Sequence, residues 1–83
     1  MIKIPVDLGA LIPIDREKAG QITSAASRYA CTVTLEQDGI VLNLKSMIGL
    51  LSQSIPRDGH MTLVADGENE QLAIDAVLEV IGG

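Results

Sequence analysis

The chain has 83 residues, a formal net charge of -5 and a hydrophobic content of 47%. This length corresponds to a single domain (residues 1–83) with enough apolar material for a core. The acidic balance argues against nucleic acid and anionic membranes as partners, because both attract clustered Lys and Arg. The single Cys excludes an internal disulfide, and one Cys with one His offers no metal site and indicates no cofactor. No signal peptide or membrane-spanning run is visible, so we expect a cytoplasmic location.

The N-terminal region is predicted to form a strand followed by a helix. Apolar and polar residues alternate from Ile2 to Leu8, a pattern typical of a strand with one apolar face. Pro5 cannot donate a ladder hydrogen bond, so we expect it at a sheet edge or a bulge. Apolar residues recur at helical spacing from Arg16 to Tyr29. Asp15 directly precedes this helix and suits an N-cap.

Two strands joined by a tight turn are predicted next. The first runs from Cys31 to Glu36, and the second runs from Ile40 to Leu44. The Asp38-Gly39 dipeptide between them is a strong signal for a hairpin turn. The two strands are therefore expected to pair in the antiparallel sense.

The C-terminal half is predicted to hold a short helix, a strand and a longer helix. Ser46 suits the N-cap of a helix from Met47 to about Ser52. A fourth strand carries Met61, Leu63 and Ala65, and the last helix, from about Glu70 to Ile81, carries a buried stripe of Leu72, Ala73, Ala76, Val77 and Val80. The order βαββαβα predicts an α+β fold, an open-faced β-sandwich in which three helices cover one face of a four-stranded antiparallel sheet.

This order of elements, the Asp38-Gly39 turn and the segment NLKSMIGL (43–50) resemble the bacterial phosphocarrier HPr family. The resemblance extends over the whole chain, essentially without gaps. It implies a small cytosolic protein of the phosphoenolpyruvate-dependent sugar phosphotransferase system. In that family a His in a Gly-x-His-x-Arg-Pro-Ala pattern passes phosphate from enzyme I to sugar-specific IIA components. The helix N-terminus and the Arg stabilise the phosphoryl group there.

The segment that matches this phosphorylation site differs at its functional positions. It reads PIDREKA (13–19), so Asp15 stands in place of the phosphoacceptor His and Glu17 in place of the Arg. Lys18 replaces the Pro. The only His, His60, lies far away in sequence at the start of the predicted fourth strand. The sequence therefore predicts that the protein is not an enzyme and has no catalytic residue for phosphate transfer through His.

Three roles for Asp15 remain open from the sequence. It can serve only as a helix N-cap that also complements the helix dipole. Its permanent negative charge can also mimic phosphohistidine. A third role, acceptance of phosphate by the carboxylate, requires a metal-binding carboxylate cluster, for which Asp7 and Glu17 are the only plausible helpers.

Ser46 is the candidate regulatory phosphosite that the resemblance implies. In Gram-positive HPr and its His-lacking paralogue Crh, a kinase phosphorylates the Ser of a Lys-Ser-x-x-Gly segment, and the product binds a catabolite-repression transcription factor. Lys45, Ser46 and Gly49 match that segment. A role as helix cap is compatible, because phosphate is favourable at a helix N-terminus. Glu17 would repel this phosphate if it lies nearby.

The expected partner-docking surface combines the start of the first helix with the short helix. Its residues are Asp15, Arg16, Lys18, Lys45, Met47, Ile48 and Leu51. Met47 and Ile48 are equally compatible with the core, because apolar residues of a short helix are commonly buried. The charges of Arg16, Lys18 and Lys45 could partly offset the repulsion from Glu17.

The leading functional interpretation is a non-catalytic, HPr-like regulatory or adaptor module. Its partners would be phosphotransferase components or a transcriptional regulator, in the control of sugar transport and catabolite repression. The protein is expected to be a monomer or a domain-swapped homodimer. One alternative function is a self-assembling structural module, in which strands exchange between chains as in the swapped dimers of Crh. The other is a diverged phosphocarrier of unknown role.

Overall fold

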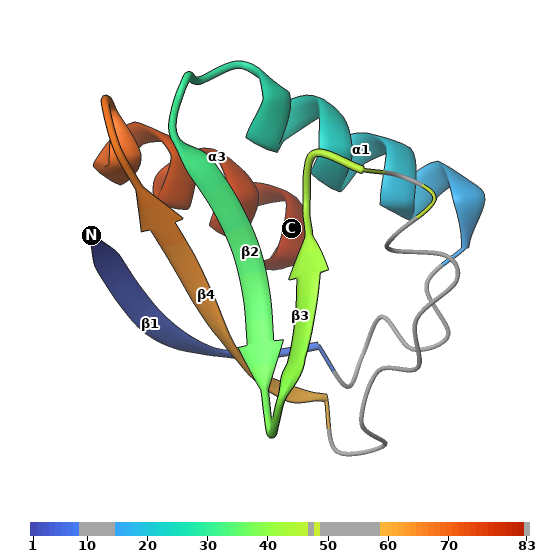
Figure 1. Cartoon of the computed structure of the whole chain (residues 1–83). Coiled ribbons are helices and arrows are strands. Elements are labelled where there is room, and N and C mark those ends of the chain that lie inside the picture. Colours follow the sequence, from blue (N-terminus) through green and yellow to red (C-terminus); the bar gives the residue numbers. More distant parts are fainter. Residues whose placement is uncertain (9–14, 47, 49–58, 83) are drawn as a thin grey trace.

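The computed structural model describes residues 1–8, 15–46, 48 and 59–82 (Figure 1). The described elements are β1 (Ile2–Asp7), α1 (Arg16–Ser27), β2 (Thr32–Gln37), β3 (Ile40–Asn43), β4 (His60–Asp66) and α3 (Glu70–Gly82). The short helix predicted from Met47 to Ser52 falls outside the described residues, except for Ile48, which is helical. The described part of the predicted order is therefore confirmed, with two helices in it.

The four strands form one sheet in the order β1-β4-β2-β3, and every neighbouring pair is antiparallel. Across the middle of the sheet Ile4 pairs with Leu63, Leu63 with Leu35, and Leu35 with Leu42. Because side chains alternate along a strand, this register places one row of aliphatic side chains on the same face. Pro5 lies in the edge strand β1, as its missing N–H predicts.

Both described helices cover the same face of the sheet (Figure 1). The core between the two layers is aliphatic, and α1 contributes Ala19, Ile22, Ala25 and Ala26 to it. Aromatic packing is confined to Tyr29, which lies partly buried against this core. The small Ala side chains let α1 lie close to the sheet, so the core is filled mainly by Leu, Ile and Val.

The structure corrects two details of the predicted helices. α1 ends at Ser27 with Arg28 as its C-cap, two residues before the predicted end at Tyr29. In α3 the predicted stripe included Leu72, which is wrong, because this side chain is 51% exposed while Ile74 is 2% exposed. The helix packs its Ala73, Ile74 and Val77 side inward, and Leu72 lies further round toward solvent.

Candidate functional site

The first turn of α1 is organised by Asp15. Its backbone is extended (φ -86°, ψ 174°), and its Oδ1 accepts a hydrogen bond of 2.7 Å from the backbone N–H of Lys18. The Asp15 carbonyl accepts a further hydrogen bond from the N–H of Ala19. Asp15 is therefore the N-cap of α1, with its negative charge at the positive end of the helix dipole.

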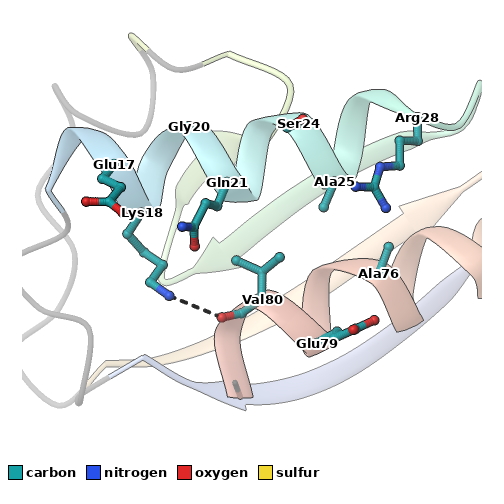
Figure 2. Close-up of a pocket in the computed structure, with 10 residues that line it drawn as sticks. All are labelled: Glu17, Lys18, Gly20, Gln21, Ser24, Ala25, Arg28, Ala76, Glu79 and Val80. Carbon is teal, nitrogen blue, oxygen red and sulfur yellow. Dashed lines mark hydrogen bonds between the residues drawn. The ribbon is translucent and has the colours of Figure 1, made fainter.

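The charged residues that follow Asp15 divide between solvent and the neighbouring helix. Arg16 and Glu17 are exposed on the first turn of α1. Lys18 is half-buried, and its Nζ lies 3.5 Å from the backbone carbonyl of Val80 in the last turn of α3 (Figure 2). A cation is favourable at the negative end of a helix dipole. Lys18 thus joins the start of α1 to the end of α3.

The segment that contains Ser46 begins with a turn directly after β3. Asn43 Oδ1 accepts a hydrogen bond from the N–H of Lys45, and the Asn43 carbonyl accepts one from the N–H of Ser46. The ammonium of Lys45 donates to the carbonyl of Tyr29 at 2.7 Å, beyond the C-terminal end of α1. These contacts fix the backbone that leads into Ser46, whose side chain is half-buried.

Among the three apolar residues of the predicted docking surface, Ile48 is the one that the structure describes. This side chain is 80% exposed, so it does not belong to the core. Exposure of a large aliphatic residue carries an entropic and solvation cost that burial against a partner removes. Met47 and Leu51, the other apolar members, lie outside the described residues, as does Gly49.

A second charged cluster, at the start of α3, was missed by the sequence reasoning. Glu70 Oε2 lies 2.9 Å from the N-terminal amine of Met1 and accepts a hydrogen bond from the N–H of Gly67. The bond from the amine, with that from Gly67, lowers the pKa of the Glu70 carboxyl from its ordinary value. The bond to Glu70 likewise raises the pKa of the amine. Glu70 is the first residue of α3, and an acidic residue at a helix start is the signal visible in the sequence.

His60 lies at the start of β4, on the exposed side of the strand. Its Nε2 is 3.7 Å from Asp7 Oδ2, and both side chains are about two-thirds exposed. His60 is therefore not at the start of α1, where the sequence would need a phosphoacceptor. Asp7, one of the two helpers considered for Asp15, lies beside His60 at the end of β1.

The described residues form neither a metal-binding cluster nor a membrane-spanning helix. No group of three or more His, Cys, Asp or Glu side chains is placed to hold a metal ion in residues 1–8, 15–46, 48 and 59–82. In the same part of the chain, neither helix has the length and apolar character needed to cross a bilayer.

Comparison with known proteins identifies the family of this fold and site. Residues 14–82 match the family model described as the PTS HPr component phosphorylation site. The chain is 32% identical to the HPr-like protein Crh of Bacillus subtilis over 75 residues, covering 90% of this chain and 88% of that one. It is 28% identical to the Crh of Halalkalibacterium halodurans over 81 residues, covering 98% and 96% of the two chains.

Solved structures show the same fold. The HPr of Thermoanaerobacter tengcongensis superposes with a TM-score of 0.86 at 23% identity, covering 99% of this chain and 92% of that one. Bacillus subtilis Crh superposes with a TM-score of 0.73 at 28% identity, covering 99% and 90%. That Crh crystal structure is described as a domain-swapped, intertwined dimer.

Proposed function

Because the chain belongs to the HPr family, we propose that it is a Crh-like regulatory binding protein that does not carry phosphate on His. Proteins of this family are phosphocarriers and regulators, so the prediction that the chain is not an enzyme is confirmed. The observation that carries the proposal is at the start of α1. Asp15 caps this helix through its own carboxylate, and the single His of the chain lies on β4.

Electrostatics at the start of α1 supports this proposal. A phosphoryl group there would meet the carboxylates of Asp15 and Glu17, both of which are exposed in the first turn. Like charges a few ångströms apart repel even near the surface, where the effective dielectric constant is high. The exposed Arg16 and the half-buried Lys18, whose ammonium lies 3.5 Å from the Val80 carbonyl, offset this repulsion in part. A fixed negative charge at this position can still act as a mimic of phosphohistidine toward a partner.

Ser46 is the proposed point of control. Its place in the fold is set by the turn at Asn43 and by the hydrogen bond of Lys45 to Tyr29. A phosphate of about -1.5 to -2 charge at this site would add charge beside the exposed Ile48. Lys45 already bonds to Tyr29. We therefore expect the N-terminus of the predicted short helix and Arg16 to stabilise the phosphate more than Lys45 does.

The proposed docking surface contains the exposed Asp15, Arg16 and Ile48, with Met47 and Leu51 as further members and Lys18 and Lys45 as anchors behind it. A partner would cover Ile48 with an apolar pocket and meet the charges of the first turn of α1 at its rim. We propose phosphotransferase components or a transcriptional regulator of catabolite repression as partners, in the cytoplasm.

Phosphorylation by a Gram-positive HPr Ser kinase with ATP tests the point of control. Intact mass and site mapping should show one phosphate on Ser46, and the Ser46→Ala variant should remain unmodified. Phosphate on another residue, or none in the parent chain, would remove Ser46 from the proposal.

Binding to a catabolite-repression regulator tests the docking surface. The Ile48→Asp variant should weaken binding at least tenfold, equivalent to about 1.4 kcal/mol. Val41→Asp is the matched control, because Val41 is also exposed (58%) but lies on β3, outside the proposed surface. Equal losses in the two variants, with unchanged circular dichroism, would contradict the docking surface.

A swapped dimer is the second candidate, favoured by one observation. The edge strand β1 pairs with β4 alone among the described strands, and the related Crh forms a swapped dimer in its crystal. Exchange of this terminal strand would re-form its pairing with β4 between the two copies. Light scattering after size exclusion distinguishes this candidate, because a stably swapped dimer retains its dimeric mass on dilution.

A further inference from the structure

The two helices on the covered face of the sheet carry opposite charges. α1 and its C-cap residue contain three basic residues, Arg16, Lys18 and Arg28, against one acidic residue, Glu17. α3 contains the three acidic residues Glu70, Asp75 and Glu79 and no basic residue. The segment from α1 to its C-cap therefore has a net positive charge, and α3 has a net negative charge.

A groove of about 640 Å³ runs between the two helices (Figure 2). Its floor is formed by small or half-buried apolar residues, Ala25, Ala76 and Val80, and the Val80 side chain points into the space between the helices. Its margins carry Glu17, Lys18 and Arg28 on the α1 side and Glu79 on the α3 side. The floor is thus apolar, and charges of both signs lie at the margins, with Arg28 and Glu79 as an exposed pair of opposite sign.

The helices run in opposite directions along this groove. The start of α1 lies beside the end of α3, because Lys18 reaches the carbonyl of Val80. At the other end, Arg28 lies level with Ala76 and close to the level of Glu79 (Figure 2). Arg28 and Glu79 thus occupy similar heights on the two sides of the groove.

We propose that this helical face binds a second copy of the chain, with α1 of each copy packed across α3 of the other. A two-fold axis parallel to the groove places α1 of one copy over α3 of the other. Rotation about this axis does not change the position of a residue along the groove. Arg28 of each copy then faces Glu79 of the other, so the same ion pair forms twice. The facing helices are also antiparallel, which is favourable for their dipoles.

The opposite net charges of α1 and α3 favour a second copy of the chain as the partner of this face. A partner of one sign would be attracted by one helix and repelled by the other, because like charges across an interface are unfavourable. A copy related by the two-fold axis supplies the opposite pattern automatically. Leu72, which is 51% exposed and lies one helical turn before Ala76, adds apolar surface to α3.

The size of the face predicts a weak dimer. Helices of 12 and 13 residues are about 18–20 Å long, and packed helices lie about 8–10 Å apart. Such a face buries about 400 Å² on each copy, or about 800 Å² in total, below the usual size of a stable interface. We therefore expect reversible association that depends on protein concentration. This inference does not depend on Ser46 or Ile48, which lie outside the face.

Sedimentation velocity and amide NMR spectra over about 10 µM to 1 mM test the proposal. We expect a reversible increase in mean mass, with concentration-dependent shifts at Ala25, Arg28, Ala76 and Glu79. Arg28→Glu and Glu79→Arg should each weaken association at least tenfold, and the double variant should restore it. Lys3→Glu on the opposite face of the sheet is the control for the change in net charge, and it should associate like the parent.

Four outcomes would overturn the proposal. The first three are a monomer throughout the range, shifts confined to other elements, and association that Arg28→Glu leaves unchanged. The last result is the one expected of a strand-swapped dimer, since exchange of β1 does not use the Arg28–Glu79 contact. Failure to restore association in a folded double variant would equally contradict the paired arrangement.

Discussion

The ammonium of Lys45 donates to the backbone carbonyl of Tyr29 at 2.7 Å, across 16 positions of sequence. This bond attaches the residue before Ser46 to the chain just after α1, while Asn43 fixes the turn on the other side. Lys45 therefore belongs to the scaffold that positions Ser46. Its role in the proposed site is structural, and its charge is already engaged before any phosphate is added.

Replacement of Lys45 should lower stability. Lys45→Met keeps the aliphatic stem but leaves the Tyr29 carbonyl without its charged donor, and we expect a loss of about 1–2 kcal/mol in urea unfolding. Lys3→Met, on the exposed side of β1, is the matched control and should change stability by less than about 0.5 kcal/mol. Equal effects of the two variants would show that the bond to Tyr29 contributes nothing.

The capping carboxylate of Asp15 should contribute measurably to stability. Asp15→Ala removes the acceptor for the Lys18 N–H and should cost about 0.5–2 kcal/mol. Asp15→Asn keeps a capping oxygen and should retain most of that stability. Both variants remove the negative charge, but only the Asn variant keeps the capping hydrogen bond. The difference in stability between the two variants therefore measures the cap alone. A stable Ala variant would contradict the observed cap.

Gly67 is required by the turn between β4 and α3. Its φ is +129°, and a Cβ built on it lies 3.1 Å from the backbone Cα of Cys31. Gly67→Ala combines an unfavourable backbone conformation with a close contact to backbone, so we expect a loss of about 1–3 kcal/mol. Gly82→Ala is the control, because nothing lies within 4 Å of its Cβ and Ala favours helix. Thermal unfolding of the two variants should therefore move in opposite directions.

The pH dependence of stability should report the cluster around Glu70. The N-terminal amine and the Gly67 N–H lower the pKa of Glu70 in the folded chain below the ordinary value of 4.5. The stabilisation of the fold by the ionised Glu70 carboxylate is therefore fully present above pH 4.5, and it is lost as the pH falls through the folded pKa. The amine has a raised pKa, so its contribution is present below pH 8.0 and is lost at higher pH.

Glu70→Gln should remove the acid trend and weaken the alkaline one, to which Asp66 also contributes. The variant should show a flatter stability curve below pH 4.5 and above pH 8 in urea unfolding, because both shifts depend on this carboxylate. Glu68→Gln is the control, since Glu68 is exposed in the same turn. A curve for Glu70→Gln that matches the parent at both ends would disprove the coupling of these two groups.

The sequence predicted the sheet well because strand alternation is strictly local information. The inward positions of Val33, Leu35 and Leu42 follow directly from a period of two. The stripe of α3 was less accurate, since Leu72 and Ile74 differ in burial only through the direction in which the helix packs. Several adjacent apolar residues in α3 left that direction open.

The candidate site was predictable in identity but not in contacts. The absence of His at the start of α1 and the cap at Asp15 follow from residue type and position alone. The contacts of Lys18 with Val80 and of Lys45 with Tyr29 join residues distant in sequence. Long side chains reach such partners only once the tertiary fold exists, so both residues looked like surface charges in the sequence.

Phosphorylation by phosphoenolpyruvate and enzyme I, followed by intact mass measurement, tests the central claim most directly. The parent chain should keep its unmodified mass, because Asp15 and Glu17 occupy the start of α1. The double variant Asp15→His/Glu17→Arg should gain the mass of one phosphate in an acid-labile form, which shows that the scaffold and the enzyme are competent. A phosphate on the parent chain, at Asp15 or at His60, would contradict the account of a regulatory protein without carrier function.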